Sequence, residues 1–288
     1  RPESFYCDSA VFGDFIIMPT QNPSSDKDMS ILKNEIWDCI RKEATKEAAN
    51  EPILTSFLHT TILNHDNFAS SLAFHLSNLL SSATASALSL REVIDESFAQ
   101  NSHIIDAAIK DIAAIRDRDS ACGECGTPFL YYKGYHALQS YRVAHWLWTQ
   151  NRNELALFLQ SRISNCFGVD IHPAAKIGFG LMLDHATGIV IGETSVVGNN
   201  VSIMQSVTLG GTGKDTRDRH PKIGDGVLIG AGSKILGNIN VGECAQVCAG
   251  SVVLNDVPAH SAVAGVPAQV VGTPNEDMPS LYMNQQLS

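Results

Sequence analysis

A branched aliphatic residue returns at every sixth position along a central stretch that runs from Ile171 to about Val257. This period fits neither an α-helix nor a strand of alternating polarity. The series is Ile171, Ile177, Leu183, Ile191, Val197, Ile203, Leu209, Ile223, Ile229, Ile235, Val241, Val247 and Val253. The period is typical of a solenoid in which short parallel strands stack coil on coil and bury their aliphatic side chains between neighbouring coils.

Two interruptions of this period predict loops at the surface of the stack. In the first, eight residues instead of six separate Leu183 from Ile191, so the turn that contains Asp184 and His185 is two residues longer. In the second, the polar segment 211–222 leaves the stack. Loops held by a rigid scaffold commonly carry functional residues. We therefore expect the chemistry at these two loops, both of which contain histidine.

The chain divides into four parts. Residues 1–27 mix apolar residues with prolines and are expected to form a poorly ordered arm. Apolar residues recur at helical spacing over the next part, which predicts an all-helical domain at 28–166. The repeat domain occupies 168–273, and the polar segment 274–288 is expected to be mobile. The predicted fold class is therefore α+β, with the helices and the strands in separate domains.

The composition argues against several functional classes. A net charge of −10 disfavours nucleic-acid binding, which needs a basic face. No stretch reaches the length of a membrane span, so no membrane partner is expected. Seven scattered cysteines, an odd number, indicate a reducing compartment rather than a disulfide framework. We expect a cytoplasmic protein; the chain opens on Arg1, so a preceding targeting segment cannot be read.

The first loop contains a candidate general base. His185 follows Asp184, and Asp170 lies one coil earlier. An imidazole accepts a proton near neutral pH, and a carboxylate on its other nitrogen fixes its tautomer. Asp170 and His185 could form such a pair across neighbouring coils. On spacing alone, a surface turn that Asp184 and His185 merely make polar is equally consistent.

The second loop is rich in cations. It contains Arg217, Arg219, His220 and Lys222. Arginine suits the bidentate binding of a carboxylate, and a group of cations suits phosphates. An ordinary solvated loop has a similar composition, and it is the favoured interpretation when these residues are considered by themselves.

Two patterns resemble metal sites, and neither is complete. Cys122 and Cys125 form a Cys-X-X-Cys pair, but the chain lacks a second pair with the spacing of structural zinc, so incidental thiols are the favoured interpretation. His172, His185 and His220 could bind zinc together. The aspartates beside two of them fit acid–base chemistry equally well. No metal site is predicted.

Four segments closely resemble the serine O-acetyltransferases, a family within the hexapeptide-repeat acyltransferases. They are 127–146 in the helical domain, with TPFLYYKGYHALQ at its start, and 169–176, 183–194 and 207–222 in the repeats. The likeness extends over about residues 28–273. It implies a left-handed parallel β-helix behind an α-helical domain. It also implies homotrimers of β-helices, which are commonly paired into homohexamers through the helical domains.

The resemblance implies a reaction as well. The acetyl group of acetyl-CoA passes directly to the L-serine hydroxyl in a ternary complex, the first committed step of cysteine synthesis, with acetyl-CoA as cosubstrate and no tightly bound cofactor. His185 matches the general base, and Asp170 matches the carboxylate that orients it. His220 lines the same site from the neighbouring subunit.

The remaining matched residues bind the two substrates. Asp119 and Asp184 match the acids that pair with the serine ammonium, and Arg219, with His220 beside it, fits the serine carboxylate. Small residues would let the pantetheine arm lie along the coils, and lysines would bind the CoA phosphates. These residues are Gly210, Gly211, Ala231 and Ala249 for the arm, and Lys222 and Lys234 for the phosphates.

The resemblance points to two further partners. L-Cysteine is serine with sulfur in place of oxygen, so it is expected as a feedback inhibitor at the serine site. Family members that bind O-acetylserine sulfhydrylase typically end in isoleucine, whereas this sequence ends in Gln286-Leu287-Ser288, which disfavours that complex.

Three other functions are kept as alternatives. One is an acetyltransferase for another hydroxyl substrate, such as homoserine or a sugar. A second is a non-catalytic scaffold that regulates a sulfhydrylase, and a third is a metal-dependent hydrolyase on the same fold. Asp119 and Arg219 disfavour a sugar, which has neither an ammonium nor a carboxylate group for them to bind.

Overall fold

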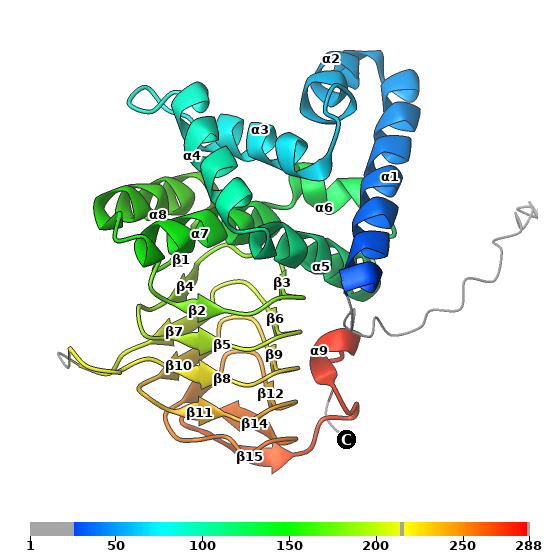
Figure 1. Ribbon diagram of the computed structural model, residues 1–288. Helices are drawn as coiled ribbons and strands as arrows, with labels where there is room; N and C mark the ends of the chain where they lie inside the picture. Colours follow the sequence, from blue (N-terminus) through cyan, green and yellow to red (C-terminus); the bar gives the residue numbers. More distant parts are fainter. Residues whose placement is uncertain (1–25, 214–215, 287–288) are drawn as a thin grey trace, which may run out of the picture.

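A computed structural model describes residues 26–213 and 216–286 of the chain. Helices form the first part of the described chain, and coils of short strands stack beneath them (Figure 1). The arm predicted for 1–27 lies outside the described residues, except for its last two positions.

The helical region begins with the long helix α1 (Asp26–Asn50). Its buried side chains follow the helical period, with Met29, Ile36, Ile40 and Ala44 facing the core. Side-chain oxygens cap the starts of later helices, as where Asn67 accepts a hydrogen bond from the Ser70 amide. The other elements are η1 (Pro52–Leu54), α2 (Thr55–Leu58), the π-helical η2 (His59–Leu63), α3 (Phe68–Leu80), α4 (Ala87–Gln100), α5 (His103–Arg118), α6 (Gly126–Tyr131), α7 (Lys133–Thr149) and α8 (Asn153–Phe167).

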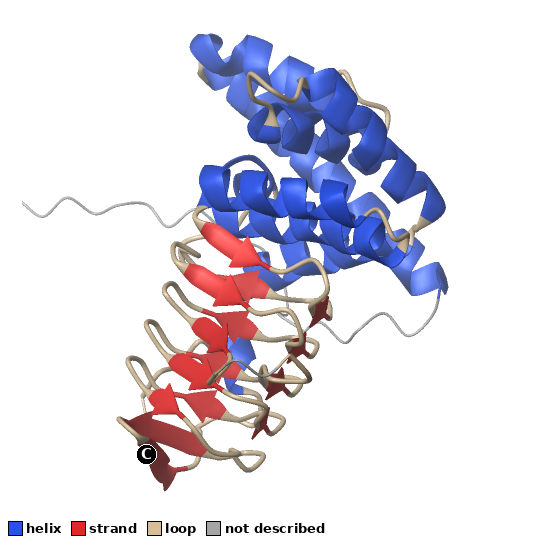
Figure 2. Cartoon of the chain, turned by 90° about the vertical axis from the view of Figure 1, so that its left-hand side faces the viewer, coloured by secondary structure: helices blue, strands red, loops and turns tan. Residues whose placement is uncertain are grey.

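The strands build a parallel β-helix whose coils contribute in turn to three sheets (Figure 2). The sheets are β1-β4-β7-β10-β13, β2-β5-β8-β11 and β3-β6-β9-β12-β14-β15. The strands are β1 (Val169–Ile171), β2 (Lys176–Ile177), β3 (Met182–Leu183), β4 (Ile189–Ile191), β5 (Val196–Val197), β6 (Ser202–Ile203), β7 (Thr208–Gly210), β8 (Lys222–Ile223), β9 (Leu228–Ile229), β10 (Lys234–Leu236), β11 (Asn240–Val241), β12 (Gln246–Val247), β13 (Val252–Val253), β14 (Ala262–Gly265) and β15 (Ala268–Gly272).

The register of the coils confirms the reading of the six-residue series. Ile171 pairs with Ile191, and Ile191 pairs with Leu209, so equivalent aliphatic residues stack directly above one another. Apart from Ile177, which is partly buried, every member of the series is buried. The prediction of a helical domain followed by a parallel β-helix is therefore confirmed.

The final strand reverses direction, because β15 pairs antiparallel with β14. The chain then runs back along the outside of the coils and forms the short helix α9 (Pro279–Tyr282) (Figure 1). Residues 274–286 of the tail lie in the described part of the chain, and the expected mobility of the tail stays a prediction. Ser202 of β6 donates a hydrogen bond to the Ser280 carbonyl over 2.9 Å.

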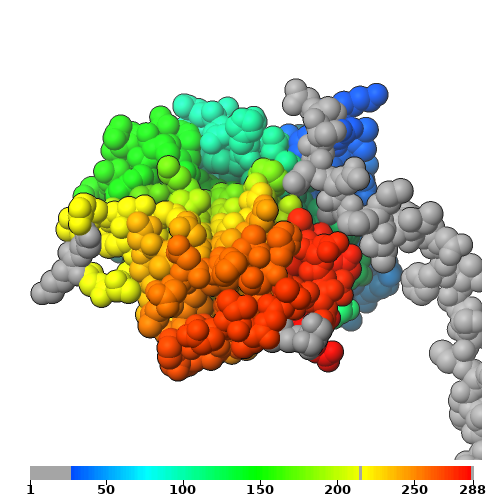
Figure 3. Space-filling view, turned by 90° about the horizontal axis from the view of Figure 1, so that it is seen from below, coloured from blue at the N-terminus to red at the C-terminus, as the bar shows by residue number. Residues whose placement is uncertain are grey.

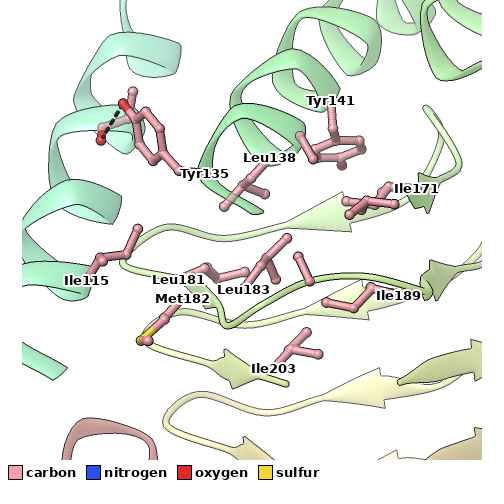
Figure 4. Packing of buried hydrophobic residues seen from close by; sticks show 14 of the residues in the cluster. Ile115, Tyr135, Leu138, Tyr141, Ile171, Leu181, Met182, Leu183, Ile189 and Ile203 are labelled. Carbon is pink, nitrogen blue, oxygen red and sulfur yellow. Dashed lines mark hydrogen bonds between the residues drawn. The ribbon is translucent and has the colours of Figure 1, made fainter. Parts of the chain in front are cut away.

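The helical region and the β-helix share one core. Leu138 and Tyr141 of α7 lie above Ile171 and Leu183 of the first coil (Figure 4). The Tyr141 hydroxyl also donates to the Ala175 carbonyl. Helix α7 therefore covers the open end of the stack.

A buried carboxylate reinforces this junction. One oxygen of Asp111, in α5, accepts hydrogen bonds from Arg142 (2.6 Å) and Gln139 (3.0 Å) of α7. The other oxygen accepts from the Leu181 amide over 2.9 Å, immediately before β3. Breaking a buried ion pair costs about 3–5 kcal/mol, so this network holds α5, α7 and β3 together.

No helix in the described part of the chain has the length and apolar character needed to cross a membrane.

Candidate active site

A cleft of about 640 Å³ opens where the helical region meets the β-helix. Both predicted substrate-binding acids and the predicted base line it. The wall comes from the end of α5, the junction of α6 and α7, the turn after β3, and the tail. Its residues are Arg118, Asp119, Ser120, Ala121, Tyr131, Tyr132, Lys133, Met182, Asp184, His185, Met204, Met283 and Gln285.

Asp119 enters the cleft because α5 ends at Arg118 and the backbone of Asp119 is extended. One oxygen of its carboxylate accepts from the Ala121 amide over 2.9 Å. The other accepts from the Tyr132 hydroxyl over 2.9 Å. Burial, and then the hydrogen bond to Asp119, raise the pKa of Tyr132, so its phenol remains a donor at neutral pH. Tyr132 therefore fixes the orientation of Asp119.

The two-residue interruption after β3 turns His185 outward. His185 and Ala186 have φ values of 54° and 58°, a left-handed conformation that is unfavourable for residues other than glycine. Packing against α7 holds this turn in place. A Cβ atom at Gly134 would lie 2.2 Å from the Leu183 carbonyl oxygen, so only glycine allows the helix to approach this closely. The His185 side chain is 76% exposed and projects into the cleft.

Asp184 interacts electrostatically with both His185 and Asp119. The Nε2 atom of His185 lies 3.9 Å from Asp184 Oδ1. Burial raises the pKa of Asp184, the adjacent imidazole opposes that shift, and the negative charge of Asp119 adds to it. A cationic substrate group would relieve this repulsion, so the two acids form a suitable site for an ammonium group.

Arg118 connects the cleft to the β-helix and the tail. Its guanidinium donates to Ser202 Oγ over 3.1 Å and to Asn200 Oδ1 over 3.4 Å. Burial lowers the pKa of Arg118 to about 10, so it stays charged at neutral pH. The Ser202 hydroxyl also donates a hydrogen bond to the Ser280 carbonyl in the tail. Arg118, next to Asp119, and the tail are therefore bound to the same side chain.

Arg219 and His220 form a separate cluster at another corner of the coil. Arg219 donates to Glu193 over 2.6 Å. The Thr194 hydroxyl accepts from the backbone amides of Arg219 (3.0 Å) and His220 (3.1 Å). Neither Arg219 nor His220 lines the cleft of His185. Figures 1 and 3 show the loop that carries them on the opposite side of the coils from α9.

The ring of His220 is held rigidly and remains neutral. Its Nδ1 accepts from the Thr194 amide over 3.1 Å, which assigns the proton to Nε2. The ring packs on Gly192, where a Cβ atom would lie 2.1 Å from His220 Cδ2. Burial, followed by the charge of Arg219, lowers its pKa. The neutral ring can therefore donate a hydrogen bond from Nε2.

Asp170 lies on β1, and the structure gives it a partner other than His185. Gln160 of α8 donates to Asp170 Oδ1 over 2.7 Å. The Nδ1 atom of the neighbouring His172 accepts a hydrogen bond from the Ala174 amide. Burial lowers the pKa of His172. The role of Asp170 as the carboxylate that orients His185 stays a prediction. His172, His185 and His220 do not meet as a set of metal ligands within the described chain.

The residues predicted to bind CoA lie at two corners of the coils, with Gly210 and Lys222 near the Arg219 loop and Ala231 and Ala249 in the coils below the His185 turn. Lys222 donates to the Thr194 carbonyl (2.8 Å), the His220 carbonyl (2.7 Å) and Asp218 (2.6 Å), which uses all three of its donors. Lys234 donates to the carbonyls of Ser206 and Gly232. Gly210 ends β7 and Gly211 follows it, while Ala231 and Ala249 lie in turns after β9 and β12.

Sequence reasoning did not single out four residues that shape these clusters. Tyr132 orients Asp119, and Lys133 donates to the Thr187 hydroxyl beside His185. Glu193 and Thr194 hold the Arg219 loop. All four lie inside segments that carry the family resemblance, but their contacts join residues that are far apart in the sequence.

An exposed imidazole in a cleft with two carboxylates, at the end of a parallel β-helix, is an arrangement suited to an enzyme that activates a hydroxyl group by general-base catalysis. Comparison with known proteins specifies the class. The serine acetyltransferase N-terminal family matches residues 36–140. Serine acetyltransferase of Escherichia coli K12 is 56% identical over 253 residues, which are 88% of this chain and 93% of that protein.

The chain is also similar to solved structures of serine acetyltransferases. Serine acetyltransferase from Vibrio cholerae has a TM-score of 0.87 at 57% identity, covering 88% of this chain and 98% of that one. A serine acetyltransferase in complex with cysteine has a TM-score of 0.87 at 55% identity, covering 89% and 100%. One in complex with CoA has a TM-score of 0.80 at 57% identity, covering 83% and 100%. The chain belongs to the serine acetyltransferase family.

Proposed function

We propose that His185 is the general base in the direct transfer of the acetyl group from acetyl-CoA to the L-serine hydroxyl. The observation that carries this proposal is the cleft, in which an exposed imidazole stands beside two carboxylates. His185 would remove the hydroxyl proton as the oxygen attacks the thioester carbonyl. The thiolate of CoA would then leave and take up the proton from the imidazolium. No acyl-enzyme intermediate is needed.

Asp119 and Asp184 would bind the serine ammonium. Asp119 is already oriented by Tyr132 and the Ala121 amide, so little rearrangement is needed on binding. The raised pKa of Asp184 supports the same role, because a nearby cation favours its ionised form. A sugar would leave both acids without a positive partner.

Arg219 and His220 would bind the serine carboxylate from a second copy of the chain. Within one chain, β4 separates the two corners, and the four residue steps from Gly188 to Gly192 span about 13 Å at the rise of an extended strand. A single serine cannot bridge both corners of the same coil. A cyclic homotrimer would bring the Arg219 corner of each chain to the His185 corner of its neighbour. Pairing of trimers into hexamers stays a prediction from the family resemblance.

Acetyl-CoA would lie along the coils beside the loop. The complex of a relative with CoA supports CoA as the ligand. Gly210, Gly211, Ala231 and Ala249 would leave room for the pantetheine arm. Lys234 uses two of its three donors within the chain, so it is a better candidate for a phosphate than Lys222, whose donors are all engaged.

L-Cysteine would compete with serine at the same site. It has the same ammonium and carboxylate groups, and a relative was solved in complex with cysteine. A cytoplasmic location stays a prediction, as does the expectation that the C-terminus disfavours a complex with O-acetylserine sulfhydrylase. The terminal residues on which the latter depends, Leu287 and Ser288, lie outside the described chain.

The test is release of CoA from acetyl-CoA with L-serine, L-homoserine or a sugar as acceptor. We expect release to depend on L-serine, and added L-cysteine to raise the apparent KM for serine. Equal or greater rates with homoserine or a sugar would overturn the substrate assignment. The absence of release with any acceptor would favour the non-catalytic scaffold instead.

A further inference from the structure

A second cluster of polar side chains lies within the helical region, outside the cleft. Cys39 and Glu43 belong to α1, and Cys125 immediately precedes α6. Their sulfur and carboxylate atoms all lie within 4.8 Å of one another. In the described part of the chain, no other group of three histidine, cysteine or acidic side chains is close enough to hold a metal ion.

The local fold explains why these residues meet. Cys39 and Glu43 are four positions apart on a helix, so both side chains lie on one face. Cys39 Sγ donates to Glu43 Oε1 over 3.0 Å. The carboxylate also accepts the amides of Cys125 (3.2 Å) and Gly126 (2.6 Å). Glu43 therefore fixes the start of α6, and with it Cys125, against α1.

We propose that Cys39, Glu43 and Cys125 bind a thiophilic divalent cation of the Zn²⁺ class. Two thiolates and a carboxylate are ligands that zinc prefers, and an open zinc site has three protein ligands and one water. Tetrahedral zinc needs sulfur and oxygen atoms about 3.5–4 Å apart, from bond lengths of about 2.3 and 2.0 Å. The Cys39 sulfur lies 3.0 Å from the nearer Glu43 oxygen, and all the candidate ligand atoms lie within 4.8 Å of one another, so the separations that zinc needs fall within the present range.

The hydrogen bonds leave room for the ion. A carboxylate can accept about four hydrogen bonds, and Glu43 accepts three. Metal binding would displace the protons of both thiols to the solvent. Loss of the Cys39 proton would free the Glu43 lone pair that now accepts it. Glu43 could then bind the ion and keep both backbone amides as partners.

The surroundings suit a cation that needs a water ligand. Glu43 also lines a separate pocket of about 290 Å³, which gives the cluster access to solvent. The carboxylates of Glu47 and Glu124 line the same pocket and outnumber its one cation, Lys46. With two thiolates and a carboxylate, a bound divalent ion would leave one negative charge. The Arg116 guanidinium lies 3.8 Å from Cys125 Sγ and would share its positive charge between that thiolate and its present partners Glu35 and Asp117.

The test uses full-length, tag-free protein kept reduced with a phosphine and stripped of metal with a chelator. Zn²⁺ is then titrated against a chromophoric competitor, and Co²⁺ serves as a spectroscopic substitute. We expect one tight zinc per chain, a thiolate-to-cobalt charge-transfer band, and a higher midpoint of thermal unfolding with zinc. Cys39→Ser and Cys125→Ser should each lower zinc affinity at least about tenfold, since removal even of an outer partner costs that much.

Cys122→Ser is the matched control, because Cys122 shares the Cys-X-X-Cys motif with Cys125 but is not part of the cluster. It should leave zinc affinity unchanged, as should a substitution of the exposed Cys166. Absence of the charge-transfer band in the folded wild-type protein would overturn the proposal. So would zinc affinity that survives both Cys39→Ser and Cys125→Ser, or that depends on Cys122.

Discussion

The two corners joined by β4 are held in place by different means. At the Asp184–His185 corner, the position of the turn depends on a separate domain, since α7 presses Gly134 against the Leu183 carbonyl. At the Arg219–His220 corner, the backbone amides of Arg219 and His220 donate hydrogen bonds to the hydroxyl of Thr194, and these bonds hold the loop within the β-helix itself. The first corner should therefore respond to changes in domain packing, and the second to the loss of one polar group.

The largest expected effect is at the first corner. His185→Ala should lower kcat at least about a hundredfold, because general-base catalysis commonly contributes a factor of 10²–10⁴. Serine-dependent CoA release measures it, and circular dichroism checks the fold. His103→Ala, at an exposed histidine that begins α5, is the control and should keep full activity. A near-normal kcat in His185→Ala would show that His185 is not the general base.

The helical side of the first corner should also lose stability in acid. His75 and His136 are buried and donate to the carbonyls of Leu130 and Phe129 at the end of α6. Burial lowers their pKa values from the ordinary 6.5 to about 4 and about 3. Their stabilising contribution is complete above pH 6.5. Below it, the unfolded chain binds protons that the folded chain does not, so stability falls with decreasing pH.

The expected loss is on the order of 2 kcal/mol per pH unit between about pH 6 and pH 4, as two imidazoles charge only on unfolding. Urea unfolding at a series of pH values measures it. His136→Gln retains an amide donor and should reduce the slope to about half. An unchanged slope in that variant would show that other groups cause the acid sensitivity.

At the second corner, Thr194→Val should raise KM for serine about thirtyfold. It removes a hydroxyl that accepts hydrogen bonds from the backbone amides of Arg219 and His220. Each bond contributes about 1 kcal/mol, and their loss frees both residues to move. Steady-state kinetics with varied serine measures the change. Thr194→Ser keeps the acceptor and should behave almost as the wild type. Equal effects of both substitutions would point to the lost methyl group instead.

A smaller effect is expected for Tyr132→Phe, which removes the phenol that donates to Asp119. The Ala121 amide still holds the other carboxylate oxygen, so kcat/KM for serine should fall only about fivefold. Tyr282→Phe, at an exposed residue of α9, is the control. A loss as large as that of His185→Ala would mean that Tyr132 acts on the reacting atoms and does more than position Asp119.

The sequence predicted the β-helix because the six-residue series places one aliphatic residue on each sheet of a coil, where it stacks on its equivalent in the next coil, as Ile171 does on Ile191. It also predicted the loops of His185 and Arg219, since insertions must leave the stack. It could not predict Tyr132 beside Asp119 or Cys125 beside Cys39. Those contacts depend on how α5, α6 and α1 pack, and periodicity reports only which face of an element is buried.

The strand β4 has a consequence for genetics. If each site takes His185 from one chain and Arg219 from the next, a chain lacking His185 and a chain lacking Arg219 are each inactive alone. A mixed trimer of the two, however, contains one site in three with both residues intact. At equal expression three quarters of the trimers are mixed, so co-expression should restore about a quarter of the wild-type sites. Intragenic complementation of this kind would require no change in either defective chain.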